Sequence, residues 1–240
     1  MGIVKALLVG VSEYTLFGLY KLPFCKNDLQ EMKTTLIYGL GVRKENITAL
    51  GENGTVLAKD LFSKLTEFID TISRDDTVIF YFSGHGGNGY FTLTDQRVNC
   101  DEILNLFIGT TAKYKIIIMD CCRSGEYAWD SIQQWWLDDV KNAWKEQKYA
   151  LMTSCGAGQD SGFDFARELS VYTSFLCDAI NAKFLISDGK KSLNAINKVL
   201  GYYAIRSYYE GKNYVVQDPI FLTSTKEPIL FDVDTKPQPN

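Results

Sequence analysis

Two short runs of continuously apolar residues constrain the fold of this chain more than any other feature. One run is Val78–Phe82, and the other lies within Lys115–Met119. A run of this length without alternating polar positions is typical of a strand buried on both faces, as in a parallel sheet covered by helices. The first run ends in the sequence SGHGG and the second in DCCRSG. Ligand sites of open parallel sheets lie at the carboxyl ends of the strands, so we expect any chemistry at these two ends.

The rest of the chain alternates strand patterns with helix patterns. We expect strands at Ile3–Val11, Asn46–Leu50, Thr77–Phe82, Phe91–Leu93, Lys115–Met119 and Lys148–Ser154, with late strands at Pro219–Leu222 and Ile229–Phe231. We expect helices at Cys25–Tyr38, from a Thr55 N-cap to Ile72, and at Asp101–Ile108, Ser170–Phe184 and Leu193–Tyr209. This alternation predicts an α/β protein with a mainly parallel sheet and right-handed crossovers.

The segment Tyr127–Gln147 holds all four tryptophans. Within it Ile132, Trp136, Val140 and Trp144 recur every fourth residue, which predicts an amphipathic helix. Such a helix either packs on the core or forms a contact surface, and the segment also fits a mobile linker over the site. The sequence leaves these interpretations open.

Composition narrows the classes of function. A chain of 240 residues with 46% hydrophobic residues is long enough for one sizeable α/β domain or two small ones. The net charge of −4 and the lack of a basic cluster argue against a nucleic-acid partner. The apolar N-terminal run is too short for a membrane span and lacks a signal-peptide cleavage site. Six cysteines without a CxxC pair argue against a zinc ribbon. We therefore expect a cytoplasmic protein with reduced thiols and no membrane partner.

His85, the only histidine, follows one buried strand, and Cys121 and Cys122 follow the other. The segment between the two strands has room for one crossover, so we expect neighbouring strands whose ends meet over the sheet. A lone histidine after a strand is most often structural, but a cysteine with a pKa of about 8.5 needs a base to supply thiolate. The glycines suit an oxyanion hole made by the amides of Gly86 and Cys122.

At this point the chain resembles a known family. The pairing of SGHGG with DCCRSG is similar to the caspase-like cysteine peptidases, and most closely to the metacaspase and bacterial caspase-homologue branch. The resemblance continues through ALLVGV, KNDLQEM, QDPIFL and PILF. It implies a three-layer α/β/α sandwich with a mainly parallel central sheet.

The resemblance also implies a domain organisation. One peptidase domain would span 1–233, with a large-subunit-like region at 1–125 and a small-subunit-like region at 148–233. The Trp-rich linker or helix at 126–147 would lie between them, and 234–240 would form a loose tail. Relatives are often cut in this linker, and the candidate self-cleavage sites are Lys141, Lys145 and Lys148.

In this family the nucleophile is the cysteine two places after the aspartate, which is Cys122, and its partner is His85. The resemblance thus implies a cysteine endopeptidase that works through a thioester. Cys121 is expected to be a buried packing residue, as free cysteines usually are, and Cys100, Cys155 and Cys177 are expected in the core.

The family's pocket for the residue before the scissile bond maps onto Cys25, Asp28, Ser83 and Asp120. Two carboxylates at the base of a narrow pocket would select a guanidinium or ammonium, so the resemblance implies cleavage after Arg or Lys. True caspases instead hold aspartate with arginines and have Gln in place of Asp120. Asp28 also fits a plain helix-start carboxylate.

Many metacaspases require calcium, but the region after the histidine strand offers only Asp95, Asp101 and Glu102, without the spacing of a coordination loop. The sequence therefore predicts no cofactor and does not support calcium activation. The loop Gly156–Glu168 is either a surface loop or a substrate-binding loop, with Asp160 and Asp164 as weaker candidates for binding a basic substrate.

Two other functions are compatible with the sequence. A catalytically silent caspase-like scaffold or ligand sensor is the main alternative, and a flavodoxin-like binding domain leaves the Cys–His pairing unexplained. Bacterial relatives are often linked to stress, regulated cell death or defence. The expected partners are therefore protein or peptide substrates with Arg or Lys at the cleavage site, and an activating ligand or partner protein.

Overall fold

A six-stranded sheet forms the centre of the computed structural model, which describes residues 2–16, 18–124, 148–200, 205–210 and 217–233. The strand order is β13-β8-β7-β3-β1-β2. The strands are β1 Val4–Gly10, β2 Ile47–Leu50, β3 Thr77–Ser83, β7 Tyr114–Asp120, β8 Lys148–Thr153 and β13 Ile220–Thr223. All neighbours pair in parallel except β13 and β8, which confirms the expected mainly parallel sheet.

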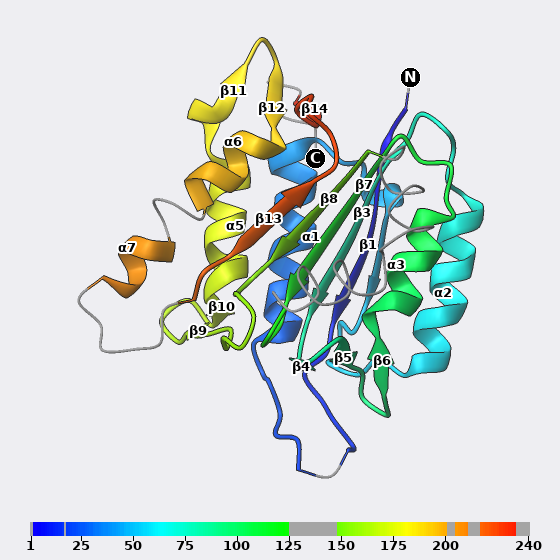
Figure 1. Ribbon diagram of the computed structural model, residues 1–240, viewed down its shortest axis with the longest axis vertical. Helices are drawn as coiled ribbons and strands as arrows, with labels where there is room; N and C mark the ends of the chain where they lie inside the picture. The colour runs from blue at the N-terminus through cyan, green and yellow to red at the C-terminus, as the bar shows by residue number, and fades with distance from the viewer. Residues whose placement is uncertain (1, 17, 125–147, 201–204, 211–216, 234–240) are drawn as a thin grey trace.

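Helices cover both faces of this sheet. Helices α1 (Cys25–Leu40) and α5 (Val171–Asn181) lie on one face, while α2 (Ala58–Asp70) and α3 (Cys100–Ile108) lie on the other (Figure 1). The arrangement is the three-layer α/β/α sandwich that the family resemblance implies. The described residues also form the helices α6 (Leu193–Lys198) and α7 (Arg206–Tyr209) and 3₁₀ turns at Lys44–Asn46 and Lys183–Leu185.

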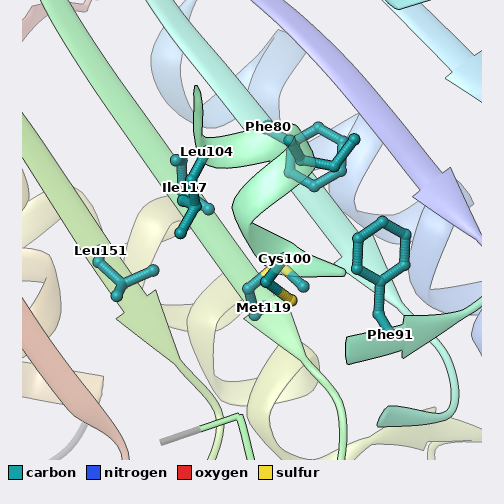
Figure 2. Close-up of a pocket in the computed structure, with 8 residues that line it drawn as sticks. Phe80, Phe91, Cys100, Leu104, Ile117, Met119 and Leu151 are labelled. Atoms are coloured by element: carbon teal, nitrogen blue, oxygen red, sulfur yellow. The ribbon is translucent and has the colours of Figure 1, made fainter. Parts of the chain in front are cut away.

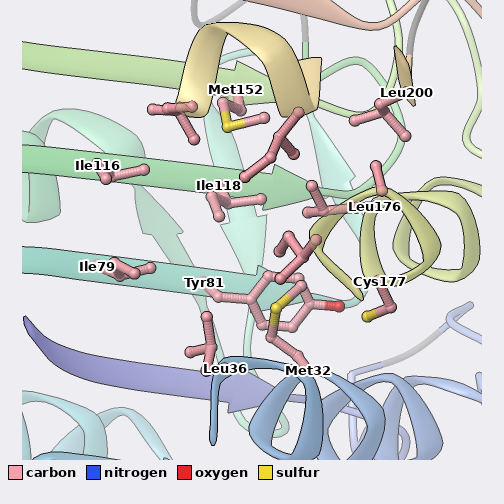
Figure 3. Packing of buried hydrophobic residues seen from close by; sticks show 14 of the residues in the cluster. Met32, Leu36, Ile79, Tyr81, Ile116, Ile118, Met152, Leu176, Cys177 and Leu200 are labelled. Carbon is pink, nitrogen blue, oxygen red and sulfur yellow. The ribbon is translucent and has the colours of Figure 1, made fainter. Parts of the chain in front are cut away.

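Strand β3 shows why its sequence is continuously apolar. Ile79 and Tyr81 point into the core under α1 and α5, where Figure 3 shows Tyr81 between the sheet and Met32. Phe80 and Phe82 point into the opposite core under α2 and α3. Because successive strand residues face opposite sides, a strand between two helix layers needs apolar residues at every position.

Shorter strands form three small sheets. They are β4 Gly86–Gly87, β5 Tyr90–Thr92 and β6 Arg97–Asn99; β9 Phe163–Asp164 and β10 Leu169–Ser170; and β11 Ile186–Ser187, β12 Lys190–Ser192 and β14 Leu230–Asp232. Of these the sequence indicates only β5 and β14, because strands of two or three residues carry too short a pattern to recognise. Strands β4, β5, β9 and β10 gather at the carboxyl ends of the parallel strands (Figure 1).

Several predicted helix ends are displaced by two or three residues, among them the ends of α2 at Asp70 instead of Ile72 and of α5 at Asn181 instead of Phe184. Helix α1 continues through Gly39 and ends where Gly41 adopts a left-handed conformation, with φ 67°. Thr55 is not the cap of α2, which begins at Ala58. The Ala58 N–H instead donates to the Asp95 carboxylate at 2.9 Å. A cap supplied from a distant loop leaves no local sequence signal, which explains the error.

Some predictions fall where the structure gives no description. The helix expected over Leu193–Tyr209 is seen as α6 and α7, and residues 201–204 between them lie outside the described residues. The Trp-rich segment 126–147 and the tail 234–240 also lie outside them, as do Lys141 and Lys145.

Lys191 ties α1 to α5 at the ends of the helices that point away from the site. Its side chain is 2% exposed, and its ammonium donates to the carbonyls of Gly39, near the end of α1, and Ile180, near the end of α5. A cation stabilises the partial negative charge of helix carboxyl ends. The contacts of Lys191 thereby hold α1 and α5 together, and the opposite ends of these helices carry the pocket residues described below.

Candidate active site

Two pockets in the described part of the chain differ sharply in their lining. One lies between the sheet and α3 and is lined by apolar side chains and Cys100 (Figure 2). The other lies at the carboxyl ends of β3 and β7 and is lined by both predicted catalytic side chains, His85 and Cys122, and by Asp120. Functional sites are pockets in which a few polar groups converge, so the second pocket is the candidate active site.

Strand register brings the two motifs together. Strands β3 and β7 pair in parallel, with Ser83 opposite Asp120. His85 lies two residues after the end of β3, and Cys122 lies two residues after the end of β7. The prediction that these strands are neighbours is therefore confirmed. Cys121 is 1% exposed, as expected of a packing residue.

The His85 ring is held by the loop that precedes α1. Its Nε2 donates to the backbone carbonyl of Tyr20 at 2.8 Å, and the rings of Tyr14 and Tyr20 pack against it at 4.6 and 4.8 Å. A carbonyl can only accept, so the proton sits on Nε2 and Nδ1 is left unprotonated in the neutral ring. Burial lowers the pKa of His85, and the Tyr20 carbonyl raises it to a lesser degree. The ring is thus neutral at pH 7 and able to accept a proton at Nδ1.

The Cys122 thiol is protonated in this state. Burial raises its pKa to about 11, the backbone N–H of Ser161 lowers it, and the nearby carboxylate of Asp160 raises it further. Among the residues that the structure describes, no hydrogen bond joins the side chains of Cys122 and His85. The site therefore holds a neutral thiol and a neutral imidazole rather than a preformed ion pair.

Gly86 lies against the nucleophile loop. A Cβ atom placed on Gly86 would come within 2.9 Å of the Cys122 carbonyl oxygen and within 2.6 Å of the Cys121 sulfur. The backbones of the two motifs therefore touch, and only glycine fits at this position. The contact brings together the two residues whose amides the sequence proposes as oxyanion donors.

The Asp28 carboxylate, on the first turn of α1, is fully buried and surrounded by donors. It accepts from the Ser83 hydroxyl at 2.7 Å, the Ser170 hydroxyl at 2.5 Å and the Ser170 N–H at 2.8 Å. The predicted pocket residues Asp28 and Ser83 are thus in direct contact. Cys25, one turn earlier on α1, lines the pocket.

The Asp120 carboxylate is 2% exposed and has a matching set of donors. It accepts from the Ser161 hydroxyl at 2.7 Å, and from the N–H and hydroxyl of Thr173 at 3.1 and 2.7 Å. Because the single hydroxyl proton of Thr173 points to Asp120, the Tyr81 hydroxyl must be the donor in its 2.5 Å contact with Thr173.

Both carboxylates therefore sit at the N-terminus of α5. Ser170 immediately precedes the helix, and Thr173 lies in its first turn. Backbone N–H groups there carry partial positive charge, which stabilises an anion by about 0.3–1 kcal/mol. Burial raises the pKa of Asp28 to about 7, with the charge of Asp120 as the second cause. Burial also raises the pKa of Asp120.

Sequence reasoning missed the residues that hold these carboxylates. One local signal pointed to Ser170 and Thr173. Ser170 is a hydroxyl residue at the start of a predicted helix, and Thr173, a second hydroxyl residue, follows three positions later. Ser161 and Phe163 of the polar loop line the pocket, so this loop belongs to the site. The Tyr20 carbonyl had no signal, because backbone groups carry no sequence identity.

The other carboxylates that the sequence singled out have separate partners. Asp164 lies 3.9 Å from Arg167. Asp95 caps α2, and Glu102 shares a capping box with Asn99 at the start of α3, where Asp101 also lies. Over the described ranges, no group of three or more His, Cys, Asp or Glu side chains is arranged to hold a metal ion. That the chain needs no calcium stays a sequence-based prediction.

The described residues bear on two further expectations. All six cysteines are free thiols, and all except Cys122 are buried. Within the described chain, none of the helices combines the length and apolarity that crossing a membrane requires.

Comparisons with known proteins agree with this geometry. The family model described as the caspase domain, Peptidase_C14, matches residues 3–216. The crystal structure of caspase-1 from Spodoptera frugiperda superimposes with a TM-score of 0.72 at 12% sequence identity, covering 99% of this chain and 92% of that chain. At that identity the likeness shows the fold alone. No curated protein matches the chain.

Proposed function

This chain belongs to the caspase-domain family of cysteine peptidases, and from that premise we propose that it hydrolyses peptide bonds after arginine or lysine. The observation that carries the proposal is the pair of buried carboxylates, Asp28 and Asp120, at the pocket that His85 and Cys122 line. None of the ion pairs between described residues includes either carboxylate. A guanidinium or ammonium would supply the missing positive charge through charge-assisted hydrogen bonds.

The proposed reaction follows from the neutral state of both groups. As the Cys122 sulfur bonds to the substrate carbonyl carbon, its proton passes to Nδ1 of His85. The Tyr20 carbonyl, which accepts from Nε2, stabilises the imidazolium that forms. His85 then gives the proton to the leaving amine as the C–N bond breaks, and water hydrolyses the thioester. The amides of Gly86 and Cys122 would hold the oxyanion.

Cleavage after aspartate is the competing specificity within this fold. An aspartate side chain in this pocket would face two buried carboxylates with no described cation beside them. Like charges in a buried site repel strongly, so binding would require protonation of several groups. The pocket residues therefore favour a basic side chain.

A silent scaffold is the second candidate, and one observation favours it. The Cys122 pKa of about 11 and the nearby Asp160 carboxylate leave little thiolate at neutral pH. Such a site is either a latent peptidase that needs an activating ligand or partner, or a binding module. The two are separated by the reactivity of Cys122 toward a substrate-like electrophile.

The first experiment measures fluorophore release from Arg-, Lys- and Asp-ended peptides, with and without calcium. Wild type is compared with Cys122→Ala and with Cys121→Ala, a matched control at the adjacent thiol. We expect turnover of the basic peptides only, lost in Cys122→Ala and retained in Cys121→Ala. Turnover of the Asp-ended peptide would contradict the basic specificity. If no peptide is cleaved, labelling of Cys122 by a peptidyl-arginine chloromethyl ketone distinguishes a latent peptidase from a scaffold.

A further inference from the structure

We propose that Asp28 and Asp120 share one proton in the empty pocket, and that a basic side chain displaces this proton when it binds. The inference rests on the proposed function for the identity of the ligand. Beyond that function, it specifies the protonation of the two carboxyl groups with and without the ligand. The pair has a net charge of −1 when empty. When occupied, the two carboxylates carry −2 and the ligand +1, so the buried site again totals −1, and the proton leaves to solvent.

The two carboxyl groups have the same structural setting. Both receive a backbone N–H and a hydroxyl from the start of one helix, α5, through Ser170 for Asp28 and Thr173 for Asp120. They also lie against neighbouring strands, because Ser83 donates to Asp28 and is the register partner of Asp120. Two carboxylates this deeply buried at one helix end repel each other, and one of them is favoured in the neutral form.

The described surroundings of the pair supply no positively charged side chain in an ion pair with either carboxylate. Several titratable groups of α1, β3, the loop after β8, α5 and α7 interact electrostatically with the pair. Each of these is an acid with a pKa raised by burial: Cys25, Tyr81, Cys155, Tyr172, Cys177 and Tyr209. His85 and Cys122 line the same pocket, and burial favours the neutral form of both. Such groups are neutral at pH 7 and contribute no positive charge. The N-termini of α1, whose first turn holds Asp28, and of α5 are therefore the main positive influences among the described elements, and each carries about half of an elementary charge.

Hydroxyl groups make up most of the hydrogen-bond donors to the two carboxyl groups. The hydroxyls of Ser83, Ser161, Ser170 and Thr173 donate to the pair, and a further side-chain hydrogen bond to Asp120 comes from Ser154. A hydroxyl donates to a carboxylate and also accepts from a protonated carboxyl, whereas an N–H can only donate. Each carboxyl group therefore has a neighbouring hydroxyl that can donate to its ionised form or accept from its protonated form. The raised pKa of Asp28, about 7, agrees with a proton held near neutral pH.

The test of displacement compares peptides that end in arginine with matched peptides that end in citrulline, its uncharged isostere. The measured quantity is the ratio of their kcat/KM values from about pH 5.5 to about pH 8.5. Titration of His85 and Cys122 in the free enzyme affects both substrates equally and cancels in the ratio. We expect the ratio to rise about tenfold per pH unit below about pH 7 and to depend only weakly on pH in Asp28→Asn. A pH-independent wild-type ratio overturns the proposal.

A second measurement needs no catalysis. In the full-length Cys122→Ala protein with ¹³C-labelled aspartate, we expect one carboxyl resonance that titrates above about pH 6. Loss of that resonance in Asp28→Asn or Asp120→Asn assigns it, and its shift in Ser170→Ala, which keeps both carboxyls, provides a second assignment. If both carboxyls finish titrating below about pH 5, the shared proton is ruled out.

Addition of a small cationic probe then tests directly whether a bound cation displaces the proton from the carboxyl pair. At pH 6.5, Nα-acetyl-arginine amide should move the assigned carboxyl signal to its ionised position, while Nα-acetyl-citrulline amide should not. Binding of the arginine probe without that shift overturns the proposal. Absence of all peptide cleavage together with a carboxyl shift would contradict the proposed peptidase and leave the proton exchange standing, so the two failures are distinguishable.

Discussion

Asp28 accepts hydrogen bonds from both the backbone N–H and the hydroxyl of Ser170, at 2.8 and 2.5 Å. This contact joins the start of α1 to the start of α5 and places a carboxylate at a helix N-terminus. It makes Ser170 a positioning residue for the proposed basic pocket.

The variant Ser170→Ala tests that positioning role. It removes one donor to the Asp28 carboxylate and keeps the backbone N–H, so the pKa of Asp28 should rise further. We expect KM for Arg-ended peptides at pH 7 to increase several-fold, with kcat little changed, because a donor worth about 1 kcal/mol is lost. Ser192→Ala, which removes the hydroxyl that precedes α6 in the same way, is the matched control. An equal effect in both variants would indicate general destabilisation instead.

The Asp28 carboxyl should make the protein less stable as pH rises. Its pKa in the folded protein is raised to about 7, above the ordinary value near 4, so the folded state binds more protons than the unfolded state between these values. The stabilisation is present below about pH 4 and is lost as pH rises through about 7, by at most about 1.4 kcal/mol per pH unit. Chemical denaturation of wild type, Asp28→Asn and the surface control Asp70→Asn at several pH values measures this.

In that experiment Asp28→Asn should flatten the dependence on pH, while Asp70→Asn should follow wild type. A difference in stability between wild type and Asp28→Asn that stays constant from pH 4 to 8 would contradict the raised pKa.

Two buried tyrosines of the same core should respond oppositely to loss of their hydroxyls. The Tyr172 hydroxyl is buried without a hydrogen-bond partner among the described residues, so Tyr172→Phe should leave the free energy of unfolding unchanged or raise it by about 1 kcal/mol. The Tyr81 hydroxyl donates to Thr173, so Tyr81→Phe should lower it by about 1 kcal/mol. Urea denaturation of the two variants measures these changes. A larger loss of unfolding free energy for Tyr172→Phe than for Tyr81→Phe would contradict the hydrogen bonding described for the two hydroxyls.

Asp160 should restrain the reactivity of the Cys122 thiol. Its carboxylate contributes to the raised pKa of that thiol, so Asp160→Asn should lower the pKa and speed alkylation by iodoacetamide several-fold at pH 8. Asp164→Asn, in the same loop but beside Arg167, is the matched control. Mass spectrometry locates the label, and Cys122→Ala gives the background. Equal rates for the two variants would argue against this electrostatic influence.

Gly86→Ala should impair catalysis more than folding. The added Cβ would lie within 2.9 Å of the Cys122 carbonyl oxygen, so the nucleophile loop must shift. A shift of a few tenths of an ångström at an oxyanion donor should lower kcat at least tenfold. Gly109→Ala is the control, because its Cβ would meet no atom closer than 3.5 Å. Retention of full kcat in Gly86→Ala would remove Gly86 from the proposed oxyanion hole.

The sequence alone determined the central strands, their alternation with helices and the placement of His85 and Cys122 at two strand ends. These features follow from local periodicity and from the composition of short windows, which a single chain displays directly. The family resemblance then identified Asp28, Ser83 and Asp120 as a group. Their proximity in the structure agrees with it, although their role in substrate binding stays a prediction.

Only the tertiary structure decided which distant groups these side chains meet. Asp95 rather than Thr55 caps α2, the Tyr20 carbonyl sets the His85 tautomer, and the start of α5 supports both pocket carboxylates. Each contact joins segments far apart in the chain. The local sequence pattern indicates whether a residue is buried, but it does not identify the residue that it contacts, because many different neighbours are compatible with the same degree of burial. The charge of Asp28 and Asp120 depends on those partners, and folding therefore sets it.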